Sequence, residues 1–211
     1  MVTVYAVWEA FLPVLLFHII SYFALWITGV FAGAPDVNAA MAATVGAVLA
    51  LPVLLGMQKK DVSAGRGSVQ KPNLLLHIFA PLIGAGLNML IAFLMRQSSV
   101  YRVFSNEVQE SLMMAPLLLR IAGIGLIVPV AEELAYRGLL YPRMKKMMPR
   151  FAAILLSAFC FGLGHGNMIQ FLYAFPMGVI LCIFLDIRGS TIAVPILIHA
   201  GANLLTVLFF G

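Results

Sequence analysis

Strongly polar residues are few in this chain, and several of them stand inside apolar stretches. Glu132, Glu133 and Arg137 follow the run AGIGLIVPVA, while His165 closes the stretch FCFGLGH. His199 and Asn203 occur together in the segment HAGAN. An ionisable group in a bilayer costs several kcal/mol on most scales, so such residues are candidates for function.

Helical spacing sorts these residues by face. Glu133 and Arg137 are four positions apart, so they can form an ion pair that lowers the cost of burying each charge. Glu132 is rotated by about 100° from Glu133 and is the carboxylate left outside that pair. His199 and Asn203 also stand four apart and face the same way.

The expected depths of the candidates agree only in part. At about 1.5 Å per residue, Glu132 lies roughly 13 Å from the end of its helix at Tyr141, and His199 a similar distance from Ser190. His165 counts as deeper, roughly 22 Å from Arg150. The helix that precedes His165 must therefore tilt or start late if the three side chains are to meet.

These residue types are the parts of a hydrolase that cleaves an amide by direct attack of water. A glutamate in a pocket of low dielectric has a raised pKa, which suits a general base near neutrality. One histidine can hold and polarise the water. A second histidine and an amide from another helix can donate hydrogen bonds to the developing oxyanion.

Other mechanisms have weaker support in the sequence. H-E-x-x-H is absent, and so is G-x-S-x-G within a span. A metallopeptidase remains an alternative, with Glu132, His165 and His199 as a zinc site, and a cysteine mechanism through Cys160 is another. The third alternative is a binding, immunity or transport protein of the membrane without enzymatic activity, for which Arg120 is the best support.

The composition identifies the medium in which these residues must be positioned. Hydrophobic residues make up 63% of the chain, charged residues 10%, and the mean hydropathy is +1.04. We expect an all-α polytopic bundle that forms a single integral-membrane domain over residues 1–211. About seven spans are predicted, at residues 8–32, 37–57, 74–95, 111–131, 151–165, 168–186 and 191–210. The fourth could continue to Tyr141, although Pro129 could kink or break it.

Charge predicts the orientation of these spans. Basic residues gather in alternate connections: Lys59, Lys60, Arg66, Lys71, Arg143, Lys145, Lys146, Arg150 and Arg188. The opposite side has only Arg96 and Arg102. The positive-inside rule therefore predicts a cytoplasmic N-terminus. The net charge of +5 is interpreted as a topology signal and not as a nucleic-acid surface, because the basic residues are not interleaved with aromatic ones.

Three motifs in order resemble those of a known family. Glu132-Glu133-x-x-x-Arg137, Phe161-x-x-x-His165 and His199-x-x-x-Asn203 are similar to the motifs of the CPBP family, the CAAX proteases and bacteriocin-processing enzymes also called Abi. The resemblance covers about residues 111–210. Tyr136 stands where the family commonly has phenylalanine before the arginine.

The resemblance implies an all-helical intramembrane glutamate protease that uses no cofactor. It implies that Glu132 and His165 activate the water, and that His199 and Asn203 form the oxyanion site. Glu133 and Arg137 would hold the helix in place, with Phe161 as a further supporting residue. The expected partners are the lipid bilayer and a peptide or membrane-protein substrate, in a bacterial or archaeal cytoplasmic membrane. Which peptide is cleaved does not follow from the resemblance.

Overall fold

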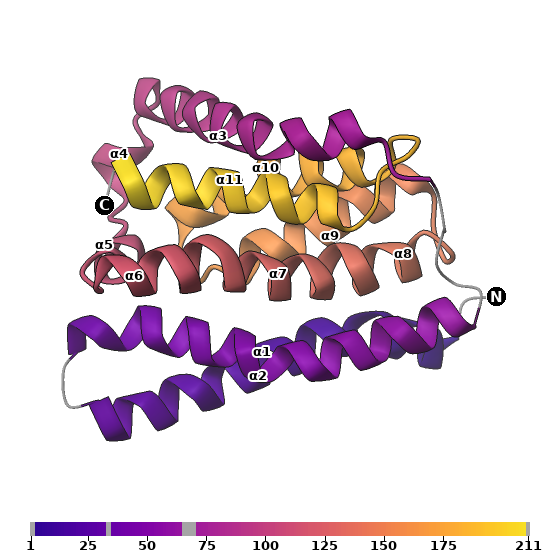
Figure 1. Cartoon of the computed structure of the whole chain (residues 1–211), viewed down its shortest axis with the longest axis horizontal. Coiled ribbons are helices and arrows are strands. Elements are labelled where there is room, and N and C mark those ends of the chain that lie inside the picture. Colours follow the sequence, from indigo (N-terminus) through magenta and orange to yellow (C-terminus); the bar gives the residue numbers. More distant parts are fainter. Residues whose placement is uncertain (1–2, 33–34, 65–70, 210–211) are drawn as a thin grey trace.

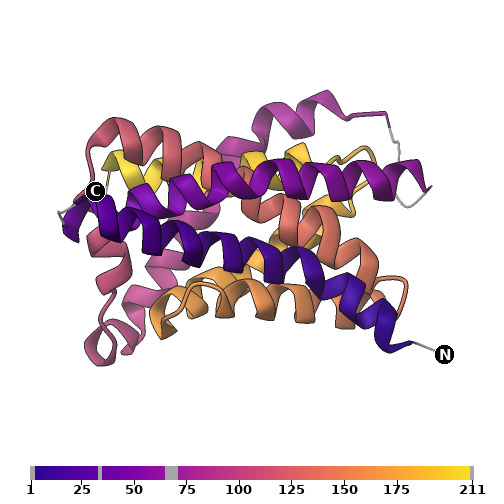
Figure 2. The same cartoon turned by 90° about the horizontal axis from the view of Figure 1, so that it is seen from below.

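The computed structural model describes residues 3–32, 35–64 and 71–209, and every regular element within them is a helix. The first two helices, α1 (Val4–Ala32) and α2 (Pro35–Ser63), run antiparallel and pack side by side along one face of the molecule (Figures 1 and 2). The expectation of an all-α bundle is confirmed.

The other helices form the larger part of the molecule. Helix α3 (Leu74–Gln97) packs along the last helix, α11 (Ala193–Phe209), and α9 (Arg150–Leu163) packs against α10 (Met168–Leu185). Two short helices, α4 (Val100–Val103) and α5 (Glu107–Met113), connect α3 to the central helical segment 117–144. In Figure 1 this central segment lies between the α1 and α2 pair and α11.

The central segment differs from the predicted fourth span in both of its ends. It begins after Pro116 and continues to Met144, as α6 (Leu117–Leu119), η1 (Arg120–Ile127), α7 (Val128–Glu133), η2 (Leu134–Leu140) and α8 (Tyr141–Met144). The segments η1 and η2 are wider π-helical turns. Pro129 therefore does not break the helix, and the segment runs past Tyr141.

Proline accounts for the two wide stretches. Each ends just before a proline, Pro129 or Pro142, which has no N–H to donate and whose ring would clash with the carbonyl four residues back. In the widened turns the N–H of Val128 bonds to the carbonyl of Gly123, and that of Tyr141 to the carbonyl of Tyr136. Such π turns within α-helices are common at functional sites.

The length and apolar character of the helices indicate an integral membrane protein. Four helical stretches are long and apolar enough to cross a bilayer: Val4–Gly29, Ala39–Ser63, Leu74–Gln97 and Met168–Leu185. Helices α9 and α11 are apolar but shorter. Large apolar side chains such as Trp8, Trp26 and Phe93 are exposed on the outside, as contact with lipid requires. The count of seven spans and the cytoplasmic N-terminus remain predictions.

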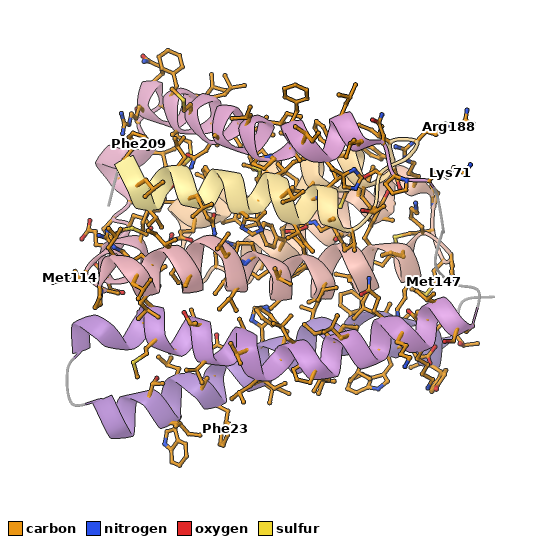
Figure 3. The ribbon with its side chains drawn as sticks, viewed as in Figure 1. Phe23, Lys71, Met114, Met147, Arg188 and Phe209 are labelled. Carbon is orange, nitrogen blue, oxygen red and sulfur yellow. The ribbon has the colours of Figure 1, made fainter. Side chains whose placement is uncertain are left out.

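The predicted basic connections gather at one end of the bundle. Lys71, Met147 and Arg188 lie at that end, and Met114 and Phe209 at the other (Figure 3). The N-terminus lies with the basic residues (Figure 1). Of the predicted basic set, Arg66 falls outside the described residues.

Ion pairs tie the helices together at this basic end. Asp186 accepts hydrogen bonds from Tyr141 Oη at 2.5 Å and Lys145 Nζ at 2.6 Å, and Arg150 Nε lies 2.7 Å from its carboxylate. Burial alone would raise the pKa of Asp186, but hydrogen bonds from Lys145 and Tyr141 and the nearby positive charges hold this pKa below its ordinary value. The ionised Asp186 therefore joins α8, α9 and α10.

Candidate functional site

A cavity of about 670 Å³ lies inside the bundle, and the predicted catalytic residues line it. Its wall includes Glu132 from α7, His165 from the turn after α9, and His199 and Asn203 from α11. The structure thus brings together four residues that are up to 71 positions apart in the sequence, as Glu132 and Asn203 are. Phe161 also borders the cavity.

Behind the cavity wall lies a fully buried ion pair. Arg137 Nη1 donates to Glu133 Oε1 at 2.8 Å, and neither side chain has any exposed surface. The same oxygen of Glu133 lies 2.9 Å from His199 Nδ1. Glu133 therefore accepts a hydrogen bond from the Nδ1–H of His199, which fixes the orientation of that ring. Arg137 neutralises the charge of the Glu133 carboxylate.

Glu132 is the carboxylate that faces the cavity. Its side chain is 18% exposed, against 0% for Glu133, and its Oε2 lies 3.7 Å from His199 Nε2. Because His199 is held at Nδ1, its Nε2 is the ring nitrogen on the side of Glu132. The predicted ion pair of Glu133 with Arg137 is present, and Glu132 lies outside it on the side of the cavity.

His165 is also held through its Nδ1. This nitrogen lies 2.8 Å from the carbonyl oxygen of Phe161, so Nδ1–H donates to the backbone and Nε2 is free to accept a hydrogen bond. The Phe161 ring lies edge-on to His165 and His199, at centroid distances of 4.8 and 5.6 Å, and the Arg137 guanidinium stands 4.2 Å from it. Phe161 thus packs against the buried arginine and against both histidines.

His165 reaches the cavity from the turn after α9 and not from the helix itself. Helix α9 ends at Leu163, and Gly166 has a φ of +78°, a left-handed conformation that favours glycine. This turn leads the chain into α10 directly after His165. Helix α9 does not start late, since it begins at Arg150, and His165 still lines the cavity.

Asn203 borders the cavity one helical turn beyond His199. Its Nδ2 donates to the carbonyl oxygen of Ile124 at 3.0 Å, in the wide η1 stretch. An amide nitrogen has two protons, so one donor remains after this contact. The side chain is anchored by the central segment.

Two groups at the site escaped the sequence interpretation. His18 of α1 lines the cavity, and its Nε2 lies 2.8 Å from the hydroxyl of Tyr136. His18 stands inside an apolar span, but nothing in the sequence places α1 beside the central segment. Because position 136 matches a phenylalanine of the family pattern, the pattern indicates no role for the Tyr136 hydroxyl.

The alternatives to a glutamate mechanism gain no support from this arrangement. Among the described residues, no three His, Cys, Asp or Glu side chains are grouped closely enough to hold a metal ion. Cys160 is half-buried and does not line the cavity, and neither does Arg120, whose Nη1 lies 3.9 Å from Met113 Sδ.

The cavity occupies the part of the bundle away from the basic connections. Its wall is made by the C-terminal halves of α1 and α3 and the N-terminal parts of α2 and α10. Polar side chains at its far end include Arg96, Asn106, Gln109 and Gln170. The cavity therefore extends from Glu132 toward the end of the bundle where α5 lies.

Comparison with protein families gives one match. Residues 114–205 match the family model described as Type II CAAX prenyl endopeptidase Rce1-like. Comparison with curated proteins and with solved structures gives no match. The matched region holds all three motifs and confirms the resemblance to the CPBP family. It leaves out α1, α2 and α3.

Proposed function

We propose that this chain, which carries an Rce1-like domain of the CPBP protease family at residues 114–205, is an intramembrane endopeptidase that uses Glu132 to activate water. The observation that supports the proposal is that two adjacent carboxylates have different surroundings. Glu133 forms an ion pair with Arg137 and a hydrogen bond with His199, whereas Glu132 faces the cavity. The membrane would be the cytoplasmic membrane of a bacterium or archaeon.

The proposed reaction begins with a water molecule between Glu132 and His165. The water transfers one proton to the Glu132 carboxylate. Its other hydrogen forms a hydrogen bond to Nε2 of His165, which accepts because Nδ1 carries the ring proton. The resulting hydroxide attacks the carbonyl carbon of the scissile peptide bond. Glu132 then transfers its proton to the leaving amine as the C–N bond breaks, which restores the carboxylate.

The oxyanion formed by that attack needs hydrogen-bond donors. A protonated His199 donates through Nδ1 to Glu133 and presents Nε2–H to the oxyanion. The second amide proton of Asn203 is the other donor. Both side chains are fixed by protein contacts before substrate binds, which is the condition for strong stabilisation of a developing charge.

The test uses the purified protein and synthetic membrane peptides, with and without a prenylated C-terminal cysteine, and mass spectrometry of the products. We expect Glu132→Gln to lower kcat by at least roughly 10² while the protein keeps its thermal stability, because the glutamine cannot accept the proton. The control is Glu110→Gln, which removes an exposed carboxylate in α5. Cleavage by Glu132→Gln at the rate of this control would contradict the proposal.

Chelation separates this mechanism from that of a zinc peptidase. Treatment with a metal chelator should leave the rate of cleavage unchanged, because the proposed water is activated by Glu132 and His165 alone. Loss of activity on chelation, with recovery on addition of zinc, would favour the metallopeptidase.

A further inference from the structure

His18 is a polar residue in the middle of an apolar transmembrane helix. A residue of this kind is costly in a bilayer unless it has a partner or faces a polar cavity, and His18 has both. It borders the cavity that Glu132 and His165 also line. It comes from α1, outside the region that matches the protease family.

Tyr136 fixes the orientation of this histidine. Its hydroxyl lies 2.8 Å from His18 Nε2 and 3.4 Å from the carbonyl oxygen of Cys160. The second distance is long for a hydrogen bond from a hydroxyl, so the hydroxyl proton goes to Nε2. His18 then carries its own proton on Nδ1, which has no hydrogen-bond partner among the described residues.

The surroundings of the pair keep it in place. The Tyr136 ring is buried and packs edge-on against Phe161 at a centroid distance of 5.2 Å. A Cβ at Gly164 would lie 2.7 Å from the Tyr136 hydroxyl and 2.9 Å from Cε1 of His18. The glycine directly before His165 therefore leaves the space that the pair occupies.

All three histidines of the cavity thus have one nitrogen held by the protein. His165 and His199 are held at Nδ1, by a backbone carbonyl and by Glu133, so each directs Nε2 at the reacting groups. His18 is held at Nε2 and has Nδ1–H left. It offers a donor in the wall of the cavity that Glu132 also lines.

We propose that His18 binds the substrate, by donating its Nδ1–H to a backbone carbonyl of the peptide that lies against Glu132. Tyr136 is a positioning residue that acts through His18. The inference rests on the proposed peptidase function and deepens it, since it adds a substrate-binding group from the N-terminal helices. A contact that is equally strong in the bound substrate and in the transition state lowers KM and leaves kcat unchanged.

Three substitutions of His18 separate substrate binding from helix packing. Asparagine places an amide N–H near the position of Nδ1. Glutamine places its amide oxygen near Nε2, where it can accept the Tyr136 hydroxyl proton, and it leaves no donor near Nδ1. With the peptide that the wild type cleaves, we expect His18→Ala and His18→Gln to raise KM roughly tenfold at similar kcat, the effect of one lost hydrogen bond. His18→Asn should stay within about threefold of the wild type.

Tyr136→Phe is the second test, since it removes only the hydroxyl and keeps the buried ring. It should raise KM by a few-fold in the wild-type background and have no effect in the His18→Ala background, because Tyr136 acts through His18. Wild-type KM for His18→Ala or His18→Gln, or equal effects of Tyr136→Phe in both backgrounds, would overturn the inference.

Glu132→Gln, measured beside these variants, keeps this inference distinct from the proposed function. An inactive Glu132→Gln with unchanged KM in the His18 variants refutes only the role of His18. An active Glu132→Gln refutes the peptidase mechanism itself.

Discussion

At the scale of single residues, one oxygen of Glu133 has two partners. Arg137 and His199 both contact Oε1, so the ion pair and the orientation of the His199 ring depend on the same carboxylate. Buried ion pairs contribute little net stability, but removal of one partner leaves an uncompensated charge. Glu133 and Arg137 therefore position His199 as well as stabilising their own helix.

Arg137→Met is expected to destabilise the protein by about 3 to 5 kcal/mol, because it leaves Glu133 charged and buried. Thermal unfolding in detergent measures the effect, and Arg188→Met, which removes an exposed arginine, is the control. Adding Glu133→Gln to Arg137→Met should recover part of the loss in stability. Equal melting temperatures for Arg137→Met and Arg188→Met would show that the pair is not buried as described.

At the scale of elements, the position of α11 depends on its close approach to α3. A Cβ on Gly84 of α3 would overlap the carbonyl group of Ile198, and one on Gly201 of α11 would overlap the carbonyl of Pro81. Small residues allow such close packing between membrane helices. Because Ile198 precedes His199, this contact helps to set the depth of His199.

Gly84→Ala is therefore expected to displace α11, with a loss of stability of about 1 to 3 kcal/mol and a lower kcat. Gly86→Ala is the matched control in the same helix, since a Cβ there meets no atom within 4 Å. Thermal unfolding and the cleavage assay measure the two effects. A Gly84→Ala protein that behaves like Gly86→Ala would contradict the close contact.

At the scale of the whole molecule, the basic end and the cavity lie on different sides of the bundle. Lys71 and Arg188 mark the basic end (Figure 3), which the positive-inside rule places in the cytoplasm. The cavity extends from Glu132 toward α5 at the other end. With this orientation, a peptide would reach Glu132 from the outer half of the membrane.

Cysteine labelling tests this orientation. In a variant without Cys160 and Cys182, single cysteines at positions 105 and 114 should react with a membrane-impermeant maleimide on intact cells. Cysteines at positions 71 and 188 should react only after the membrane is opened, because they lie at the basic end. The reverse labelling pattern would show that the N-terminus lies outside, and that a peptide reaches Glu132 from the cytoplasmic half of the membrane.

The sequence by itself determined the type of fold and which residues are candidates for the site. Apolar runs of span length with few charges require helices, because backbone groups in lipid must be satisfied within the segment. The four-residue spacing of Glu133 and Arg137 was enough to predict their ion pair and to indicate that Glu132 lies outside it. These features are local, so they can be read from neighbouring positions along one helix.

Only the tertiary structure decided which helices meet at the cavity and how the central segment is built. The contact of His18 with Tyr136 joins α1 to the central segment over 118 positions, and no local pattern specifies such a contact. The hydrogen bond from His199 to Glu133 likewise depends on how α11 packs. The wide turns before Pro129 and Pro142 preserve a helix that proline could have broken, because the surrounding helices hold it in place.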